Sequence, residues 1–387
     1  MTLLIFILIL SLLVLVHELG HFFVAKKMGI KVEEFGLGIP PRIFGKQIGE
    51  TKYSLNLLPF GGFVKLSGED SEELVEKGKT PVDPRSFAYK TPLQRSLVLV
   101  AGVMMNAVLA VGLYYVLLLA HDFKTLSFPM FYDYNFRFGH LTTVDTVISG
   151  FSEDSPLKNL DIKPGEAIVK IDNTPVSSVE DVRAQVAQKV GKEVTVTLQD
   201  VLKQNIADNA AGDTGTRELV AVPIANEKGV GILGIYMGKS GVLSYETPLE
   251  KLTAGFLHSY NMLAYSGTIF SRLVGLSVET KSLAPVSEGV SGPVGIYSVV
   301  GGILGYGGNL AILGLIDFTA LMSLSLAFLN IMPIPALDGG RLLFVVIEKI
   351  RGKKVNPAIE ASAHKWGIIV LLALIFLVSI KDYLKFF

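Results

Sequence analysis

Long runs of apolar residues alternate with polar stretches along this chain. Three runs, residues 2–23, 93–120 and 310–332, are long enough to cross about 30 Å of hydrocarbon as helices. A fourth run, residues 366–380, is shorter, but basic and aromatic residues flank it and can anchor its ends at the two membrane interfaces. The pattern therefore predicts a polytopic α-helical membrane protein with four transmembrane helices.

The segment between the second and third runs has the mixed composition of a soluble domain. Four stretches there predict strands, and residues 179–190 have the spacing of a helix. The predicted strands are residues 143–148, 167–171, 193–198 and 217–222. Residues 200–216 form a polar loop to which the sequence assigns no role. We expect one small α+β domain of about 100 residues.

Two further stretches predict amphipathic elements beside the membrane spans. Tyr53, Leu55 and Leu57 alternate with polar residues, as in a half-buried strand. Residues 248–276 carry aromatic and aliphatic side chains among polar ones, as in a helix at the outer membrane interface.

Basic residues are distributed unevenly around the first two apolar runs. Lys26, Lys27 and Lys31 follow the first run, and Lys90 and Arg95 precede the second. Cytoplasmic loops carry an excess of Lys and Arg, so this region is predicted to be cytoplasmic. Counting spans onward places the inserted domain and both chain ends outside the cytoplasm.

The composition supports a membrane protein and narrows its chemistry. Half of the 387 residues are hydrophobic and only 18% are charged. Lysine plus arginine equals aspartate plus glutamate at 35 each, so no overall charge favours a nucleic-acid partner. Cysteine is absent, which excludes thiolate nucleophiles and cysteine metal ligands. Any metal must therefore be bound by His, Asp or Glu.

A candidate metal-binding motif lies inside the first apolar run. His17 and His21 are four residues apart, so on a helix their imidazoles share one face, with Glu18 beside them. A charge at the centre of a membrane costs about 2.5–3.5 kcal/mol and needs a compensating partner. A metal ion would be such a partner, whereas a surface helix with incidental His and Glu is the alternative in a soluble protein.

A catalytic zinc usually has three protein ligands, so one more is expected elsewhere. Residues 330–340 contain two prolines spaced by one residue and cannot continue the third helix. Non-helical backbone at membrane depth is tolerated where it lines the protein interior, which would bring Asp338 level with His21. An ordinary glycine-rich turn is the alternative. Paired with the histidine motif, Asp338 is the favoured third ligand.

The other histidines are less well placed. The predicted topology puts His121, His140 and His258 on the outer side, away from His21. His364 is on the correct side, but it lies in a basic stretch where we interpret it as an interfacial anchor.

These motifs resemble the site-2 protease family of intramembrane zinc metalloproteases, in particular its bacterial regulator-of-sigma-E protease branch. The resemblance spans nearly the whole chain. Besides the two motifs above, it rests on Glu33 and residues 35–38, 58–64 and 291–296. It implies that His17, His21 and Asp338 hold Zn²⁺. Glu18 would be the general base.

The resemblance also implies residues that handle the substrate. Asn330 and Asn106 match such positions, although Val103 stands where the motif around Asn106 usually has proline. A glycine-rich segment resembles a membrane-associated β element that the family places beside the active site. Its candidate residues are Leu58, Gly61, Gly62 and Phe63.

Part of the inserted domain resembles the core of bacterial PDZ domains. The matching residues are 155–157, 162–168 and 171–176. Such domains bind a peptide or a chain terminus as an added strand, whereas a spacer or steric filter without a ligand is the other interpretation. Only one such unit is visible, although well-known members of this branch carry two.

The expected fold class is a polytopic α-helical membrane protein with a membrane-associated β element and one extracytoplasmic PDZ-like α+β domain. The segments are 1–28, first transmembrane helix with the histidine motif; 29–92, cytoplasmic-side β hairpin region; 93–120, second transmembrane helix; 121–245, PDZ-like domain; 246–305, interfacial amphipathic segment; 306–340, third transmembrane helix and metal-ligand loop; and 341–387, cytoplasmic loop and fourth transmembrane helix.

The resemblance predicts a protease that cleaves single-span membrane proteins, such as anti-sigma factors or signal-peptide remnants. Its partners would be transmembrane substrates, the lipid bilayer and a peptide or chain terminus at the PDZ-like domain. Its location would be the bacterial inner membrane, with both termini extracytoplasmic. The alternative is a PDZ-containing membrane scaffold with a structural or vacant metal site, against which the presence of Glu18 argues.

Overall fold

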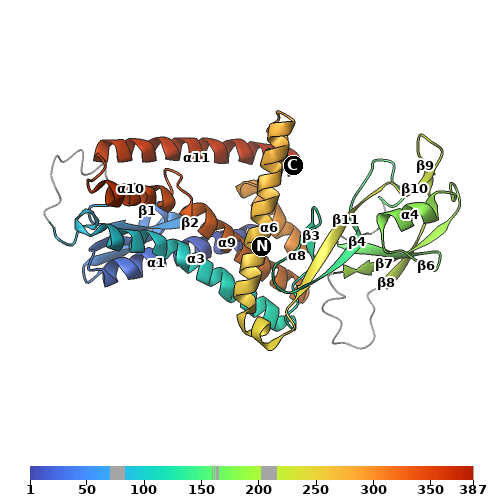
Figure 1. The fold of residues 1–387 in the computed structure, drawn as a ribbon, viewed down its shortest axis with the longest axis horizontal. Helices are drawn as coiled ribbons and strands as arrows, with labels where there is room; N and C mark the ends of the chain where they lie inside the picture. The colour runs from blue at the N-terminus through green and yellow to red at the C-terminus, as the bar shows by residue number, and fades with distance from the viewer. Residues whose placement is uncertain (70–82, 159, 161, 163–164, 202–215, 387) are drawn as a thin grey trace. The chain divides into compact units, whose positions relative to one another are not determined.

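The computed structural model describes residues 1–69, 83–158, 160, 162, 165–201 and 216–386 (Figure 1). These residues form two compact units. The first comprises Met1–Tyr114 and Ser266–Phe387, and the second comprises Tyr115–Tyr265. Most of the polar loop predicted at 200–216 lies outside the described residues.

Among the described residues, four helices are long and apolar enough to cross a membrane. They are α1 (Thr2–Lys27), α3 (Pro92–Ala120), α9 (Gly308–Ile331) and α11 (Pro357–Phe386). A helix pairs its backbone N–H and C=O groups internally, which is why apolar segments in lipid adopt this form. The four predicted helices are confirmed, although α11 begins well before the predicted residue 366.

Shorter helices complete the first unit. They are η1 (Phe87–Tyr89), α7 (Ala284–Gly289), α8 (Pro293–Gly305) and α10 (Asp338–Arg351). At the start of α8, the Asp382 carboxylate on α11 accepts the Gly292 and Gly295 N–H groups at 2.7 and 3.0 Å. These N–H groups have no partner within α8, so Asp382 caps that helix and joins it to α11.

Two long irregular strands lie against α1. Strands β1 (Val32–Ile48) and β2 (Thr51–Leu66) pair antiparallel (Figure 1). Their register shifts repeatedly, so Phe35 pairs with both Tyr53 and Val64. The final residues of β2, from Gly62 to Leu66, therefore pair with the first half of β1 and form one edge of the described sheet. The strand predicted around Tyr53 is part of β2.

A seven-stranded sheet organises the second unit. Its order is β3-β11-β4-β5-β7-β8, with β6 paired to β5. The strands are β3 (Phe128–Met130), β4 (His140–Phe151), β5 (Glu166–Ile171), β6 (Thr174–Pro175), β7 (Val194–Asp200), β8 (Thr216–Ala221) and β11 (Ile235–Ser244). A separate hairpin pairs β9 (Ile224–Ala225) with β10 (Gly231–Ile232). The four predicted strands are confirmed.

One short helix packs into the core of this unit. Helix α4 (Val179–Val186) begins at Ser178, which forms a capping box with Asp181. Val182 and Val186 on α4 join the hydrophobic core. The helix is shorter than the predicted 179–190: its buried face ends at Val186, and Val190 is exposed.

Helix α6 (Pro248–Glu279) confirms the helix predicted at 248–276. Its His258 is buried in a hydrogen-bonded network within the second unit. Asn261 Nδ2 donates to the Phe138 carbonyl at 2.8 Å and to the Tyr245 hydroxyl at 3.2 Å. That hydroxyl lies 3.2 Å from Nδ1 of His258. Burial lowers the pKa of His258 to about 3, so it is a neutral core residue at pH 7.

Candidate metal centre

Two histidines on α1 form one side of a buried polar cluster in the first unit. Their Nε2 atoms, on His17 and His21, are 3.1 Å apart. Each residue is only 7% exposed. The spacing of four residues therefore brings the two imidazoles together on one face of the helix.

Asp338 completes the cluster from a distant part of the chain. Its Oδ2 atom lies 2.9 Å from Nε2 of His17 and 3.2 Å from Nε2 of His21. Helix α9 ends at Ile331, before the two prolines, and Asp338 is the first residue of α10. Within the described ranges, this is the one group of three or more His, Asp or Glu residues whose donor atoms lie within 4.8 Å of one another.

The second ring nitrogen of each histidine determines where its lone pair points. Nδ1 of His21 donates to the Val98 carbonyl at 2.8 Å, so Nε2 carries the lone pair. Nδ1 of His17 lies 3.3 Å from Nδ2 of Asn106, whose Oδ1 is buried without a partner among the described residues. Rotating the Asn106 amide places Oδ1 against a protonated Nδ1 of His17 and satisfies both groups.

This donor set fits a metal cation. With both Nδ1 atoms protonated, two Nε2 lone pairs and a carboxylate oxygen face one another without a proton between them. Acceptors held so close repel unless a cation lies among them. Two imidazoles and one carboxylate are a ligand set that zinc accepts, with a further position left for water.

Close contact between α1 and α3 depends on two glycines. A Cβ atom on Gly20 would lie 2.3 Å from the Ala101 carbonyl oxygen. A Cβ atom on Gly102 would lie 2.4 Å from Nε2 of His21. Gly20 allows the helices to approach, and Gly102 leaves room for the imidazole. The motif around Asn106 includes Gly102, but sequence reasoning did not assign it this steric role.

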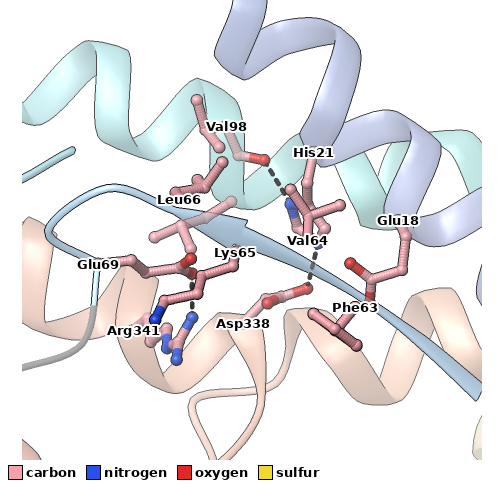
Figure 2. Close-up of a pocket in the computed structure, with 11 residues that line it drawn as sticks. Glu18, His21, Phe63, Val64, Lys65, Leu66, Glu69, Val98, Asp338 and Arg341 are labelled. Atoms are coloured by element: carbon pink, nitrogen blue, oxygen red, sulfur yellow. Dashed lines mark hydrogen bonds and ion pairs between the residues drawn. The ribbon is translucent and has the colours of Figure 1, made fainter. Parts of the chain in front are cut away.

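Glu18 lines a cavity of about 360 Å³ beside the cluster (Figure 2). Figure 2 shows Glu18 and His21 descending from α1 toward Asp338, with β2 crossing between the helices. The other lining residues are Phe63, Val64, Lys65, Leu66, Glu69, Val98, Leu99 and Arg341. The cavity therefore joins the candidate metal centre to the edge of β2.

Three charged residues in this cavity were missed by sequence reasoning. They are Lys65, Glu69 and Arg341, and Arg341 forms an ion pair with Glu69 (Figure 2). The position of Arg341 directly after the glycines of the aspartate motif was the available signal. These residues make one end of the cavity polar and charged.

The residues expected to handle the substrate differ in whether they line this cavity or lie beside His17. Phe63 lines the cavity, and a Cβ on Gly62 would lie 3.7 Å from Cγ of Glu18. Leu58 and Gly61 are not among the residues described as lining it. At the end of α9, Nδ2 of Asn330 lies 3.5 Å from Nε2 of His17. Asn106 is fully buried beside His17.

Comparisons with known proteins match this sequence to peptidases. A sequence model described as peptidase family M50 matches residues 5–374. A Clostridium perfringens protein that carries the name of a zinc metalloprotease is 32% identical over 375 residues, covering 96% of this chain and 95% of that protein. A similarly named Fusobacterium nucleatum protein is 30% identical over 389 residues, covering 100% of both. Zinc metalloprotease RasP of Shouchella clausii is 27% identical over 465 residues, covering 100% of this chain and 99% of that protein.

Proposed function

This chain belongs to peptidase family M50, the family of the site-2 proteases, and from that premise we propose that it is a zinc-dependent intramembrane endopeptidase. His17, His21 and Asp338 would hold the zinc ion. The observation that carries this assignment is the convergence of their three donor atoms within 4.8 Å, with both Nδ1 atoms directed to other partners.

Glu18 is proposed as the general base and acid. When bound, zinc polarises the scissile carbonyl and lowers the pKa of a water molecule toward neutrality. The Glu18 carboxylate, which lines the cavity beside Asp338, would accept the proton of the attacking water. It would then deliver that proton to the leaving amine.

The two asparagines are proposed to have different roles. Asn106 is fully buried and faces Nδ1 of His17, so its position favours orienting that imidazole over touching the substrate. Asn330 is half-buried, and its Nδ2 lies 3.5 Å from Nε2 of His17. Its amide would donate to a substrate carbonyl beside the metal.

A substrate helix must unwind before its peptide bond can be attacked, and β2 is proposed to bind the unwound segment. The residues from Gly62 to Leu66 pair with β1 on one side in the described sheet, and Phe63, Val64 and Leu66 line the cavity. Pairing with this edge would replace the hydrogen bonds that the substrate helix loses. The substrates proposed are single-span membrane proteins, such as anti-sigma factors or signal-peptide remnants.

Residues 121–245, which lie within the second unit, are proposed to be the PDZ-like domain, and the other segment boundaries given above are proposed with it. The strands β5 and β7 and helix α4 supply the expected mixture of elements, although parts of the motif at 155–176 lie outside the described residues. The domain would bind a peptide or chain terminus, or exclude substrates with bulky outer domains. The proposed location is the bacterial inner membrane, with this domain and both termini extracytoplasmic.

Cleavage of a single-span membrane protein by the purified chain tests the proposal. Glu18→Gln should lower the cleavage rate by about 10²–10⁴-fold, because it removes a general base while retaining a side chain of the same shape. The variant should still bind one zinc ion, since Glu18 is not a proposed ligand. A chelator should stop cleavage by the unaltered chain. Cleavage that survives both treatments would contradict the proposal, and zinc binding without cleavage of any shortened substrate would favour the scaffold alternative.

A further inference from the structure

The segment that carries Asp338 to the metal centre has an unusual backbone. Residues 332–337 connect α9 to α10 without helical structure, and the prolines at 333 and 335 have no N–H groups. Ala336 has φ +84°, a left-handed conformation that disfavours residues with a side chain. Such a backbone persists only where surrounding contacts hold it.

One contact from α11 holds this segment at Ala336. The N–H groups of Ile334 and Leu337 bond to carbonyls within the segment, those of Met332 and Ile334. The Ala336 N–H instead donates to Nδ1 of His364, at 3.0 Å. His364 thus accepts a hydrogen bond from the residue in the strained conformation, two positions before Asp338.

A second residue of α11 supports the same segment by close packing. Gly367 lies three residues after His364, so both are on one face of the helix. A Cβ atom on Gly367 would lie 2.5 Å from the carbonyl oxygen of Pro335. The His364 ring also packs on Phe344 of α10, with ring centroids 5.7 Å apart. One face of α11 therefore contacts both the segment and the helix that begins with Asp338.

We propose that His364 is a positioning residue for the metal centre, acting through Ala336 to fix the carboxylate of Asp338. Gly367 contributes by letting the Pro335 backbone lie against α11. The inference rests on the proposed role of Asp338 as a zinc ligand. His364 touches neither that carboxylate nor the other two ligands in the described contacts, so its effect is on the orientation of Asp338. The earlier interpretation of His364 as an interfacial anchor did not include this contact.

Zinc affinity separates this role from a general structural one. It can be measured on the full chain in detergent, stripped of metal, by competition with a chromophoric chelator. His364→Leu removes the acceptor and should weaken zinc binding by about 10–100-fold, the usual effect of losing a group that orients a ligand. His364→Asn retains an acceptor oxygen at the position of Nδ1 and should bind zinc nearly as tightly as the unaltered chain.

A pair of glycine variants tests the same inference without changing the histidine. Gly367→Ala should also weaken zinc binding, because its methyl group displaces the Pro335 backbone. Gly302→Ala on α8 is the matched control, since a Cβ there meets nothing within 4 Å. Thermal unfolding of the metal-free variants checks that each one folds.

The outcomes distinguish failure of this inference from failure of the proposed function. Unchanged zinc affinity in His364→Leu, or an equal loss in His364→Asn, would overturn the positioning role. Asp338→Ala provides the reference, because it should lose zinc whether or not His364 positions the carboxylate. If Asp338→Ala binds zinc normally, the ligand assignment fails, and the inference about His364 fails with it.

Discussion

Among the described residues, His17 and His21 in the first unit and His258 in the second are buried histidines with opposite surroundings: acceptors face the first pair, whereas a donor faces His258. Around His258, a donor faces an acceptor at each step: Nδ2 of Asn261 donates to the Tyr245 hydroxyl, whose own proton is left for Nδ1 of His258. Around His17 and His21, two imidazole lone pairs and the Asp338 carboxylate face one another. Burial of a histidine therefore does not indicate a metal; an excess of acceptors does.

Removing one histidine from each cluster gives the largest contrast. His21→Ala should abolish both zinc binding and cleavage, because two ligands remain where a catalytic zinc needs three. His258→Gln should retain zinc, since Nδ1 of His258 faces the Tyr245 hydroxyl and His258 is not a proposed metal ligand. Metal analysis of the purified variants checks both results. Normal zinc content in His21→Ala would contradict the difference drawn here between a metal-binding His21 and a core His258.

The space that Gly102 leaves for the His21 imidazole should have the next largest effect on zinc affinity. Gly102→Ala would put a methyl group 2.4 Å from Nε2 of His21 and should reduce zinc affinity severely. Gly112→Ala on the same helix meets nothing within 4 Å and should leave affinity unchanged. It should also stabilise the helix by about 0.5–1 kcal/mol. Chelator competition and thermal unfolding measure the pair, and tight zinc binding by Gly102→Ala would show that the imidazole is positioned differently.

Orientation of His17 should have a smaller effect. Asn106→Leu removes the group facing Nδ1 and should weaken zinc binding by about 10–100-fold. Asn106→Asp keeps an acceptor oxygen and should lose less. The zinc affinities of the two variants test whether Asn106 orients His17 through a hydrogen bond. Equal losses of affinity would mean that Asn106 contributes packing alone.

The His258 cluster should be detected through pH and not through metal. The pKa of His258 is about 3 in the folded chain and about 6.5 when unfolded, so between these values only the unfolded chain takes up the proton. Its contribution to stability is therefore complete above pH 6.5 and decreases as the pH falls toward 3. Amide hydrogen exchange in β11 should accelerate over this range. His258→Gln should reduce that dependence, whereas His140→Gln, at an exposed position, should not.

Features governed by local sequence or by the demands of lipid could be predicted, whereas contacts marked by neither could not. Hydropathy located the four long helices, and helical spacing brought His17 and His21 together. The proline break indicated Asp338 because lipid restricts where irregular backbone can lie. The His364 contact with Ala336 joins residues 28 positions apart, and no periodicity marks it.

The β elements show the same limit. Strand β11 was missed because Gly238 and Gly241 interrupt its β-branched residues, and partners on both sides stabilise it in the sheet. The alternation around Tyr53 predicted a strand but not the double pairing of Phe35, which arises from register shifts along β1 and β2. The edge of β2 at the cavity was therefore expected only from the family resemblance.

X-ray absorption spectroscopy at the zinc edge tests the central claim most directly. The purified Glu18→Gln chain, which should bind zinc without turnover, is the appropriate sample. The proposed centre predicts two imidazole nitrogens at about 2.0–2.1 Å and carboxylate oxygen in the same shell. Asp338→Ala should change the oxygen contribution, and His17→Ala should remove one imidazole. A zinc spectrum without imidazole scattering, or one unchanged by these substitutions, would contradict the assignment of His17, His21 and Asp338 as its ligands.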